Sequence, residues 1–247
     1  MIVLVTGASS GIGAAVARRF AREPGVKLVL AARRADRLEA LALPVPTHLL
    51  PLDVRDRHAV RAAIEGLPAE FADVDVLVNN AGLALGLAPA QEASLDDWDA
   101  MIDTNVRGLA YVTRAVLPGM VARDRGHVIQ LGSVAGTYPY PGGNVYGATK
   151  AFVAQLSLDL RADLLGTRVR VTSVEPGMVS GTEFSDVRFH GDSTRAAGVY
   201  EGVQALTPED VAEAIAWCAL QPAHVNVNRI ELMPVAQAFG PFAVRRT

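Results

Sequence analysis

The sequence predicts an α/β protein with a doubly wound, seven-stranded parallel sheet and helices on both faces of that sheet. Seven short apolar runs alternate with longer stretches of helical periodicity, an order that is typical of βαβ units. The chain has 247 residues, which suits one α/β domain, and no repeat or linker divides it. Half of the residues are hydrophobic and 20% are charged, as in globular proteins. We therefore expect residues 1–247 to form one domain.

Each of the first six expected strands is followed by an expected helix. The strands are Ile2–Thr6, Lys27–Ala31, Thr47–Leu52, Val74–Asn79, Gly126–Gly132, Arg168–Glu175 and Arg229–Leu232. The helices are Gly13–Arg22, Ala35–Leu41, Arg57–Leu67, Leu95–Arg123, Tyr146–Leu165 and Pro208–Leu220. Because strands and helices alternate, the strands should pair in parallel.

Local signals support individual elements. The apolar start of the chain is cut at Gly7 and has no basic region before it, so a buried strand is a better interpretation than a signal peptide. The fifth helix carries apolar residues at every fourth position, namely Phe152, Leu156, Leu160 and Leu164. This stripe should face the sheet or a partner subunit.

The sixth helix has clear signals at its start. Thr207 can cap the helix and Pro208 suits its first position. Glu209 and Asp210 then favour the positive end of the helix dipole.

Two segments resist assignment to helix or strand. They are Thr137–Asn144 and Val179–Ala205, and both are rich in Gly, Pro and polar residues. The second exceeds the usual length of a loop, so we predict that residues 179–205 form a mobile lid over a site.

Composition excludes several classes of partner. The formal net charge is −3, without the basic excess that nucleic acid or an anionic membrane surface would attract, and no membrane span is evident. The one cysteine, Cys218, excludes disulfides within the chain and permits a reducing compartment. We expect no metal site, because the histidines show no metal-ligand spacing; they are His48, His58, His127, His190 and His224.

A glycine-rich turn follows the first strand and opens the first helix. Its sequence is Thr6-Gly7-Ala8-Ser9-Ser10-Gly11-Ile12-Gly13. Glycines let the backbone turn tightly and approach a pyrophosphate, whose charge the helix N-terminus stabilises. The spacing differs from the common Gly-x-Gly-x2-Gly motif, and a tight turn without a ligand is the alternative.

Two arginines stand where the second strand ends, about 20 residues after the last glycine. An acidic residue at this place would hold the ribose hydroxyls of NAD, but here Ala32 is followed by Arg33 and Arg34. Guanidinium groups match a 2′-phosphate, so the pair indicates NADP. The alternative is a solvated basic run, to which Arg37 adds and which Asp36 partly offsets.

A tyrosine and a lysine form the strongest candidate for chemistry. Tyr146 and Lys150 lie at i and i+4, on one face of the fifth helix. A phenol has a pKa of about 10, and a nearby ammonium would lower it. Ser133 ends the fifth strand, thirteen residues earlier, at the edge where an open sheet forms its crevice. Taken singly, these residues could also be a surface pair and a turn serine.

Asparagines at two places in the chain could have either a functional or a structural role. Asn79-Asn80-Ala81-Gly82 closes the fourth strand, and its amides could contact a cofactor or simply make a turn. Asn105 lies within a helical stretch, where asparagine is a mediocre helix former, so it marks either a bend or a function.

Together these motifs resemble the short-chain dehydrogenase/reductase superfamily, in the right order and over essentially the whole chain. The matching residues are Thr6-Gly7-x3-Gly11-x-Gly13, Asn79-Asn80-Ala81-Gly82, Asn105, Ser133, Tyr146-x3-Lys150 and Pro176-Gly177. The resemblance implies a Rossmann fold, an NAD(P) cofactor and hydride transfer to or from a carbonyl carbon. It also implies a cytoplasmic homotetramer, built through the fourth and fifth helices and the last strand.

The resemblance also implies roles for individual residues. Tyr146 would be the general acid/base, and Lys150 would lower the pKa of Tyr146 and hold the nicotinamide ribose. Ser133 would orient the substrate oxygen, and Asn105 would hold a water that links Lys150 to solvent. The expected cofactor-binding residues are Gly7, Ser9, Ser10, Gly11, Ile12, Gly13, Arg33, Arg34, Asp53, Val54, Asn80, Ala81, Gly82, Tyr146, Lys150, Pro176, Gly177, Val179 and Thr182.

Within the superfamily the chain is most similar to the NADP-dependent 3-hydroxy acid dehydrogenases, which oxidise serine, L-allo-threonine and 3-hydroxypropionate-type acids. The similar stretches are residues 101–105, 141–150 and 181–189. The superfamily often places Thr five residues after the Pro of Pro-Gly; here that position is Gly181 and Thr182 follows, an offset that the subgroup shares. A substrate carboxylate needs a cationic partner, and Arg188 is our candidate beside Ser133 and Tyr146.

Two other functions remain open. A broad NADPH-dependent carbonyl reductase of neutral aldehydes and ketones would use the same catalytic residues, but would ignore a substrate carboxylate. A non-catalytic NADP-binding sensor is the other alternative, although it has no need of a hydride-transfer constellation. The tail from Pro234 to Thr247 contains Phe239 and Phe242, which suggests that it docks on the protein.

Overall fold

A computed structural model of the protein describes residues 1–240, and it contains the predicted seven-stranded parallel sheet. The strand order is β3-β2-β1-β4-β5-β6-β7, so the chain reverses direction across the sheet between β1 and β4. The strands are β1 Ile2–Thr6, β2 Lys27–Ala32, β3 Thr47–Pro51, β4 Val76–Asn79, β5 Gly126–Leu131, β6 Val169–Pro176 and β7 Arg229–Leu232. This order places a crevice at the carboxyl ends of β1 and β4.

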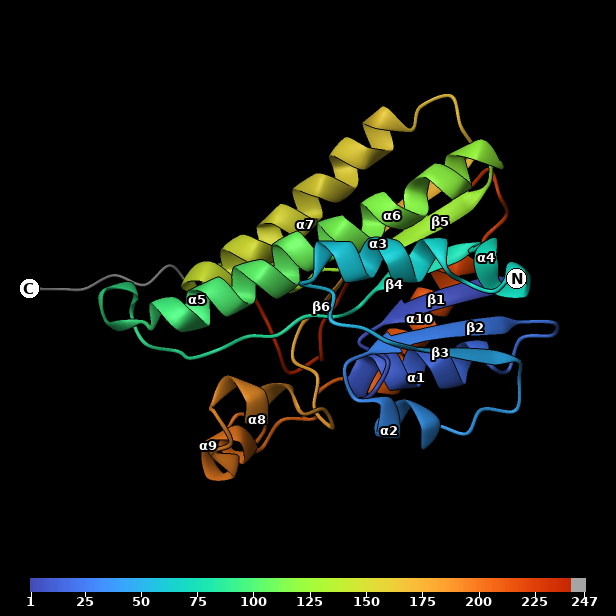
Figure 1. The fold of residues 1–247 in the computed structure, drawn as a ribbon. Helices are drawn as coiled ribbons and strands as arrows, with labels where there is room; N and C mark the ends of the chain where they lie inside the picture. The colour runs from blue at the N-terminus through green and yellow to red at the C-terminus, as the bar shows by residue number, and fades with distance from the viewer. Residues whose placement is uncertain (241–247) are drawn as a thin grey trace, which may run out of the picture.

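Helices cover both faces of the sheet, as predicted (Figure 1). One face carries α1 Gly11–Phe20, α2 Ala35–Glu39 and α10 Pro208–Ala219. The opposite face carries α3 Arg57–Glu65, α4 Ala69–Ala72, α6 Leu109–Ala122 and α7 Asn144–Asp163. The short helix α4 was not predicted, because four residues give too little periodicity to recognise.

The strand side chains alternate between two buried apolar clusters. Val3 and Val5 of β1 pack under α1 and α10, whereas Leu4 packs under α3 and α6. In the next strand, Leu28 and Leu30 join the first cluster. This period of two buries both faces of the sheet, which is what a doubly wound parallel sheet requires.

The expected single helix Leu95–Arg123 is instead two helices joined by a π-helical turn. Helix α5 spans Leu95–Ile102, the turn η2 spans Asp103–Gly108, and α6 follows. At Gly108 a Cβ atom would lie 2.7 Å from Cγ2 of Val54, so only glycine fits where the turn passes the end of β3. Single π turns often occur at functional sites.

The apolar stripe predicted on α7 is only partly correct. Leu164 is buried, but Phe152 is 37% exposed. The buried residues of the helix are Tyr146, Thr149, Lys150, Val153 and Ser157. This buried set is partly polar because the helix brings polar groups to the interior, so hydrophobicity alone did not identify it. Leu160 and Leu164 of the predicted stripe do pack against the core, and contact of the exposed Phe152 with a partner subunit stays a prediction.

Polar contacts hold both ends of α10. Asp210 N–H donates to Thr207 Oγ1 at 3.2 Å, and the Asp210 carboxylate accepts from Thr207 N–H at 2.8 Å, which confirms the predicted cap. At the other end the guanidinium of Arg170 donates to the carbonyl of Ala219 at 2.7 Å. A cation on the last carbonyls of a helix also complements the helix dipole.

Residues 179–205, named here the lid segment, contain two short helices. They are α8 Phe184–Arg188 and α9 Ser193–Gly198, which lie apart from the main body of helices in Figure 1. Ser180 N–H donates to Leu206 O at 2.9 Å, so the two ends of the segment are tied together.

The tail docks on its own subunit as far as residue 240. Met178 N–H donates to Oε1 of Gln237 at 2.8 Å, and the rings of Phe239 and Tyr138 lie 4.4 Å apart. Phe242, the second aromatic residue expected to dock, lies outside the described residues.

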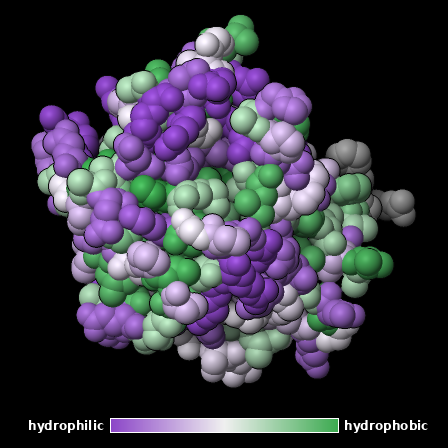
Figure 2. Space-filling model, turned by 90° about the vertical axis from the view of Figure 1, so that its right-hand side faces the viewer, coloured by the Kyte–Doolittle hydropathy of each residue, from purple (hydrophilic) through white to green (hydrophobic). Residues whose placement is uncertain are grey.

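No helix of residues 1–240 combines the length and apolar character needed to cross a membrane. Within the same range, no group of three or more His, Cys, Asp and Glu side chains is placed to hold a metal ion. The face seen in Figure 2 mixes hydrophilic and hydrophobic residues.

A buried histidine makes the fold sensitive to acid. His127 on β5 is 1% exposed and its Nε2 lies 2.7 Å from Thr172 Oγ1. Burial lowers the pKa of His127 to about 3, whereas the unfolded chain takes up this proton near pH 6.5. The folded state holds His127 in its neutral form. The stability that depends on this neutral form is therefore complete above pH 6.5 and is lost as the pH falls towards 3.

We expect this one residue to cost about 2 kcal/mol of unfolding free energy between pH 8 and pH 5. Urea unfolding at both pH values measures the loss, which should be smaller in His127→Gln because glutamine does not titrate. His224→Gln, at an exposed position, is the control and should behave like the wild type. An equal loss in all three proteins would contradict the prediction.

Candidate active site

A cleft of about 1200 Å³ opens at the carboxyl ends of the central strands. It gathers nearly all of the predicted site residues, from seven separate parts of the chain. Those that line it are Gly7, Ser9, Ser10, Gly11, Ile12, Arg33, Arg34, Asp53, Val54, Asn80, Ala81, Gly82, Ser133, Tyr146, Lys150, Pro176, Gly177, Val179, Thr182 and Arg188. Gly13 and Asn105 do not line the cleft and lie behind its wall.

The glycine turn leaves no space for side chains at two positions. Gly7 has a φ of 65°, and a Cβ atom there would lie 2.8 Å from Nδ2 of Asn80. At Gly13 a Cβ atom would lie 2.3 Å from the carbonyl oxygen of Gly7. Glycine is therefore required for the chain to turn from β1 into α1, which starts at Gly11 rather than at the predicted Gly13.

The asparagine motif after β4 supports this turn. The side chain of Asn80 donates to the carbonyl oxygen of Thr6 at 2.9 Å, and Thr6 Oγ1 accepts from the N–H groups of Asn80 and Ala81. Asn79 instead points into the core, where its amide donates to Thr113 and Gln130. Of the two roles left open for this motif, Asn80 lines the cleft and supports the turn, whereas Asn79 serves the core.

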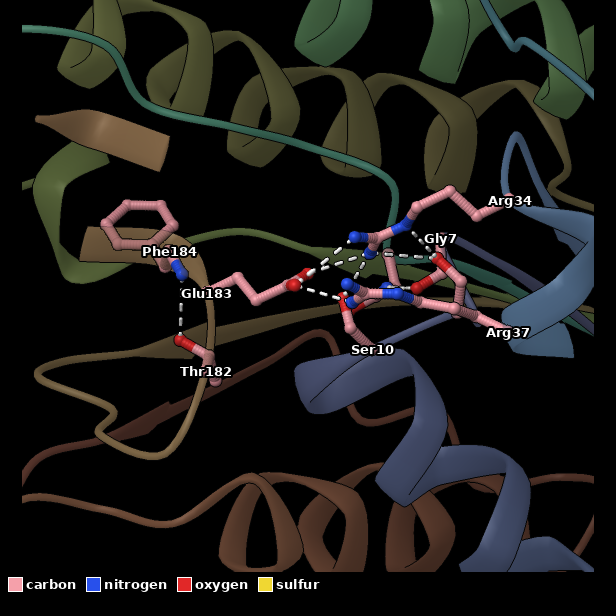
Figure 3. A network of polar contacts seen from close by, with 9 residues as sticks. Gly7, Ser10, Arg34, Arg37, Thr182, Glu183 and Phe184 are labelled. Carbon is pink, nitrogen blue, oxygen red and sulfur yellow. Dashed lines mark hydrogen bonds and ion pairs between the residues drawn. The ribbon is translucent and has the colours of Figure 1, made fainter. Parts of the chain in front are cut away.

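Arg33 and Arg34, which follow β2, line the cleft. Arg34 and Arg37 form a network with Glu183 of the lid segment (Figure 3). Arg34 donates from Nη2 to Ser10 Oγ at 2.9 Å and to Oε2 of Glu183 at 2.8 Å. Arg37 also pairs with the Glu183 carboxylate. These hydrogen bonds, with that of Arg34 first, lower the pKa of Glu183 to about 2.

Tyr146, Ser133 and Lys150 meet at the other end of the cleft. Tyr146 is buried by its neighbours, and burial raises the pKa of its phenol to about 12, while the hydroxyl of Ser133 opposes the rise. Ser133 Oγ also accepts from Ala135 N–H at 3.1 Å, which fixes the serine at the end of β5. The pKa of Tyr146 is therefore raised, whereas a nearby ammonium alone would lower it.

Lys150 lies beneath the tyrosine ring, with Nζ 5.9 Å from the ring centre. Nζ donates to the carbonyl oxygen of Leu131 at 2.8 Å, and burial lowers the pKa of the lysine to about 8. A Cβ atom at Gly82 would lie 3.6 Å from this nitrogen. Gly82 and Lys150 thus line the same part of the cleft.

Asn105, in the π-helical turn, is fully buried and anchors the wall of the cleft. Its amide donates to the carbonyl oxygen of Leu83 at 2.8 Å and its Oδ1 accepts from Leu83 N–H at 2.9 Å. The same amide donates to Oγ1 of Thr149. The structure thus commits this side chain to holding the segment after β4 against α7.

Arg188 brings a cation from α8 to the end of the cleft that holds Tyr146. Its guanidinium lies 5.7 Å from the centre of the Tyr146 ring and 5.5 Å from that of Tyr140. Nη2 donates to the Tyr140 hydroxyl at 2.7 Å, and Nε donates to the carbonyl oxygen of Gly86 at 3.2 Å. These contacts fix a positive charge next to the phenol.

Sequence reasoning missed many residues that line this cleft, and three of them contact predicted site residues. Tyr140 lies in the segment that resisted assignment, and Glu183 pairs with arginines about 150 positions earlier. The ring of Phe184 packs edge-on against Tyr146, with centroids 5.7 Å apart. The only available signal was the place of Glu183 and Phe184 in the lid segment, because their contacts depend on tertiary structure.

The residues around the glycine turn, at the end of the cleft away from Tyr146, fit a phosphorylated dinucleotide. The turn from Gly7 to Gly13 gives close access to the N-terminus of α1, where an anion is stabilised. The side chains of Arg33 and Arg34 follow β2 at the place where a 2′-phosphate would lie. Asp53 is paired with Arg55 at 2.6 Å, and this pairing lowers its pKa.

Comparison with known proteins agrees with this geometry. The short chain dehydrogenase family model matches residues 1–192. The NADP-dependent 3-hydroxy acid dehydrogenase YdfG of Salmonella typhi is 59% identical over 100% of both chains, and the serine 3-dehydrogenase of Rhizobium radiobacter is 52% identical over 99% of this chain and 98% of its own. A solved structure of serine dehydrogenase, in a closed form complexed with NADP+, superposes over 100% of both chains with a TM-score of 0.98 and 56% identity. The chain therefore belongs to the short-chain dehydrogenase family.

Proposed function

We propose that the protein is an NADP-dependent oxidoreductase that interconverts 3-hydroxy acids and 3-oxo acids. Serine, L-allo-threonine and 3-hydroxypropionate represent the substrate class. The observation that carries the proposal is the guanidinium of Arg188, held 5.7 Å from the ring of Tyr146 in the same cleft. The names of the similar proteins, 3-hydroxy acid dehydrogenase and serine 3-dehydrogenase, support it.

The cofactor, when bound, supplies the acceptor or donor of a hydride. The chain itself moves the proton. In oxidation Tyr146 Oη accepts the proton of the substrate hydroxyl, and in reduction it returns a proton to the carbonyl oxygen. Ser133 donates a second hydrogen bond to the same oxygen and so fixes its position. Lys150, buried beneath the phenol, supplies a positive charge that favours the phenolate in the oxidation direction.

The cofactor would lie along the glycine turn, with its 2′-phosphate near Arg33 and Arg34. Glycines from Gly7 to Gly13 give its pyrophosphate access to the N-terminus of α1. The remaining cleft residues proposed to hold it are Ser9, Ser10, Ile12, Asp53, Val54, Asn80, Ala81, Gly82, Tyr146, Lys150, Pro176, Gly177, Val179 and Thr182.

Arg188 is proposed to bind the carboxylate of the substrate. A 3-hydroxy acid places its carboxylate two bonds from the reacting carbon, so a cation close to the phenol suits it. Tyr140 and Gly86 hold the guanidinium from one side, which limits the freedom it must lose on binding. A neutral ketone would gain nothing from this charge.

The initial rate of NADP reduction tests the proposal. L-serine, L-allo-threonine and 3-hydroxybutyrate are compared with methyl 3-hydroxybutyrate at matched concentrations. We expect kcat/KM for 3-hydroxybutyrate to exceed that for its ester by about tenfold or more, because a charge-assisted hydrogen bond is worth about 1.5 to 3 kcal/mol. Equal use of the ester would support a general carbonyl reductase instead. Binding of NADPH with no turnover of any substrate would support a sensor.

The homotetramer and the cytoplasmic location expected from the resemblance stay predictions. Exposed apolar side chains on α6 and α7 support assembly through these two helices, since Val121 is 40% exposed and Leu158 is 52% exposed. Phe152 adds to the same kind of surface on α7.

A further inference from the structure

A carboxylate of the lid segment pairs with Arg34, one of the two arginines proposed to bind the 2′-phosphate of NADP, and with the neighbouring Arg37. Glu183, just before α8, accepts from Nη1 of Arg34 at 3.2 Å and from Nη2 at 2.8 Å. Arg37 donates to Oε1 of the same carboxylate. Figure 3 shows the Glu183 side chain extended from the lid segment towards both guanidinium groups.

The geometry of this contact is that of an arginine and a bound anion. The Nη1 and Nη2 groups of Arg34 form a fork on the two carboxylate oxygens, which is also how a guanidinium binds a phosphate. The other edge of Arg34 faces the serines of the glycine turn, with Nε and Nη2 donating to Ser9 Oγ. A phosphate that takes the fork of Arg34 must therefore displace Glu183.

Charge strengthens the competition. The pKa of Glu183 is lowered to about 2, so the carboxylate is ionised throughout the working pH range. It neutralises one of the cations that a 2′-phosphate requires, and any phosphate bound beside it meets a like charge. The contact is partly solvated, because the side chains of Arg34 and Glu183 are 40% and 39% exposed. Its effect on binding should thus be moderate.

We propose that Glu183 is a specificity-determining residue that competes with the 2′-phosphate of NADP for Arg34, one of the two arginines, Arg33 and Arg34, proposed to bind that phosphate. By doing so it weakens the binding of NADP(H) relative to NAD(H), which lacks this phosphate. The inference rests on the proposed binding of NADP at these arginines. It goes beyond that proposal because it gives a residue of the lid segment an effect on cofactor affinity, opposite in sign to that of the arginines.

Direct titration of NADPH and NADH binding, followed by nucleotide fluorescence, tests the inference without any turnover. In Glu183→Gln the side chain keeps its size but loses its charge. We expect the Kd for NADPH to fall about threefold to tenfold, while the Kd for NADH changes less than about twofold. Glu201→Gln removes the same charge from an exposed position of the lid segment and should leave both values unchanged.

A double-variant background shows whether the effect acts through the arginines. When Arg34 and Arg37 are both alanine, Glu183→Gln should change the Kd for NADPH less than about twofold. Thermal unfolding confirms that each variant is folded. Weaker binding of both nucleotides in Glu183→Gln, or an equal gain for both, would overturn the inference, as would no change. If the wild type itself shows no preference for NADPH over NADH, the proposed cofactor site fails instead.

Discussion

Replacing Tyr146 by phenylalanine should lower kcat about 1000-fold and leave the Kd for NADPH within about twofold of the wild type. The expected size follows from the contribution of general acid–base catalysis, about 10² to 10⁴ in rate. The substitution removes one oxygen atom and keeps the ring, which packs against Phe184 and above Lys150. Loss of catalysis with intact cofactor binding would identify the phenol as the proton-transfer group.

Steady-state kinetics and NADPH titration on the same preparation measure the two effects. Tyr111→Phe is the matched control, because Tyr111 packs on the sheet beside α3 and does not line the cleft. It should retain the wild-type kcat. If Tyr146→Phe kept more than about a tenth of the activity, a group other than this phenol would have to transfer the proton.

The surroundings of Tyr146 favour its protonated form. Burial raises the pKa of the phenol to about 12 and lowers that of Lys150 to about 8, so each group resists charge for the same reason. A neutral phenol can give its proton directly to a carbonyl oxygen in reduction. In oxidation the phenol must first lose its proton, and the positive charge of oxidised nicotinamide would favour this loss.

The sheet was predictable because its signals are local. All seven strands were expected within about two residues of their observed ends, since each is a short apolar run bounded by polar or turn residues. The start of α10 was equally clear from Thr207 and Asp210, whose cap depends on residues three positions apart. Such local contacts can be predicted without knowing the rest of the fold.

The meeting of the proposed catalytic residues was predictable for a different reason. Tyr146 and Lys150 share a helix face, and Ser133 ends a strand, so their meeting follows from element order. The break in the helix at Asn105 was open in the sequence as either a bend or a function, and the π-helical turn shows that the bend is real. Its amide is committed to Leu83 and Thr149.

Contacts of the lid segment could not be predicted. The pairing of Glu183 with Arg34 joins residues 149 positions apart, and no local pattern encodes it. The hydrogen bond between Arg188 and Tyr140 likewise joins residues that are distant in the sequence. Both depend on how α8 lies over the cleft, which is a property of tertiary packing rather than of periodicity. The sequence indicated a lid segment and a cation, Arg188, within it. It did not indicate that Tyr140 is the partner of Arg188 or that Arg34 is the partner of Glu183.

Replacing Arg188 by alanine should therefore separate substrates by charge. We expect kcat/KM for 3-hydroxybutyrate to fall about 30- to 100-fold, mostly through KM, because a charge-assisted contact worth about 2 to 3 kcal/mol is lost. The same value for methyl 3-hydroxybutyrate should change less than about threefold. Arg188→Lys should recover only part of the loss, since lysine lacks the planar fork.

The control is Arg195→Ala, which removes a cation from the same lid segment. Arg195 lies over the ring of Phe189, at 4.6 Å, and does not line the cleft. Its loss should leave both substrates unaffected. An equal fall for acid and ester in Arg188→Ala would mean that the guanidinium acts by holding Gly86 and Tyr140, because a group that only shapes the cleft cannot distinguish a charged substrate from a neutral one. A selective fall would instead show that it binds the carboxylate, since only the acid carries that charge.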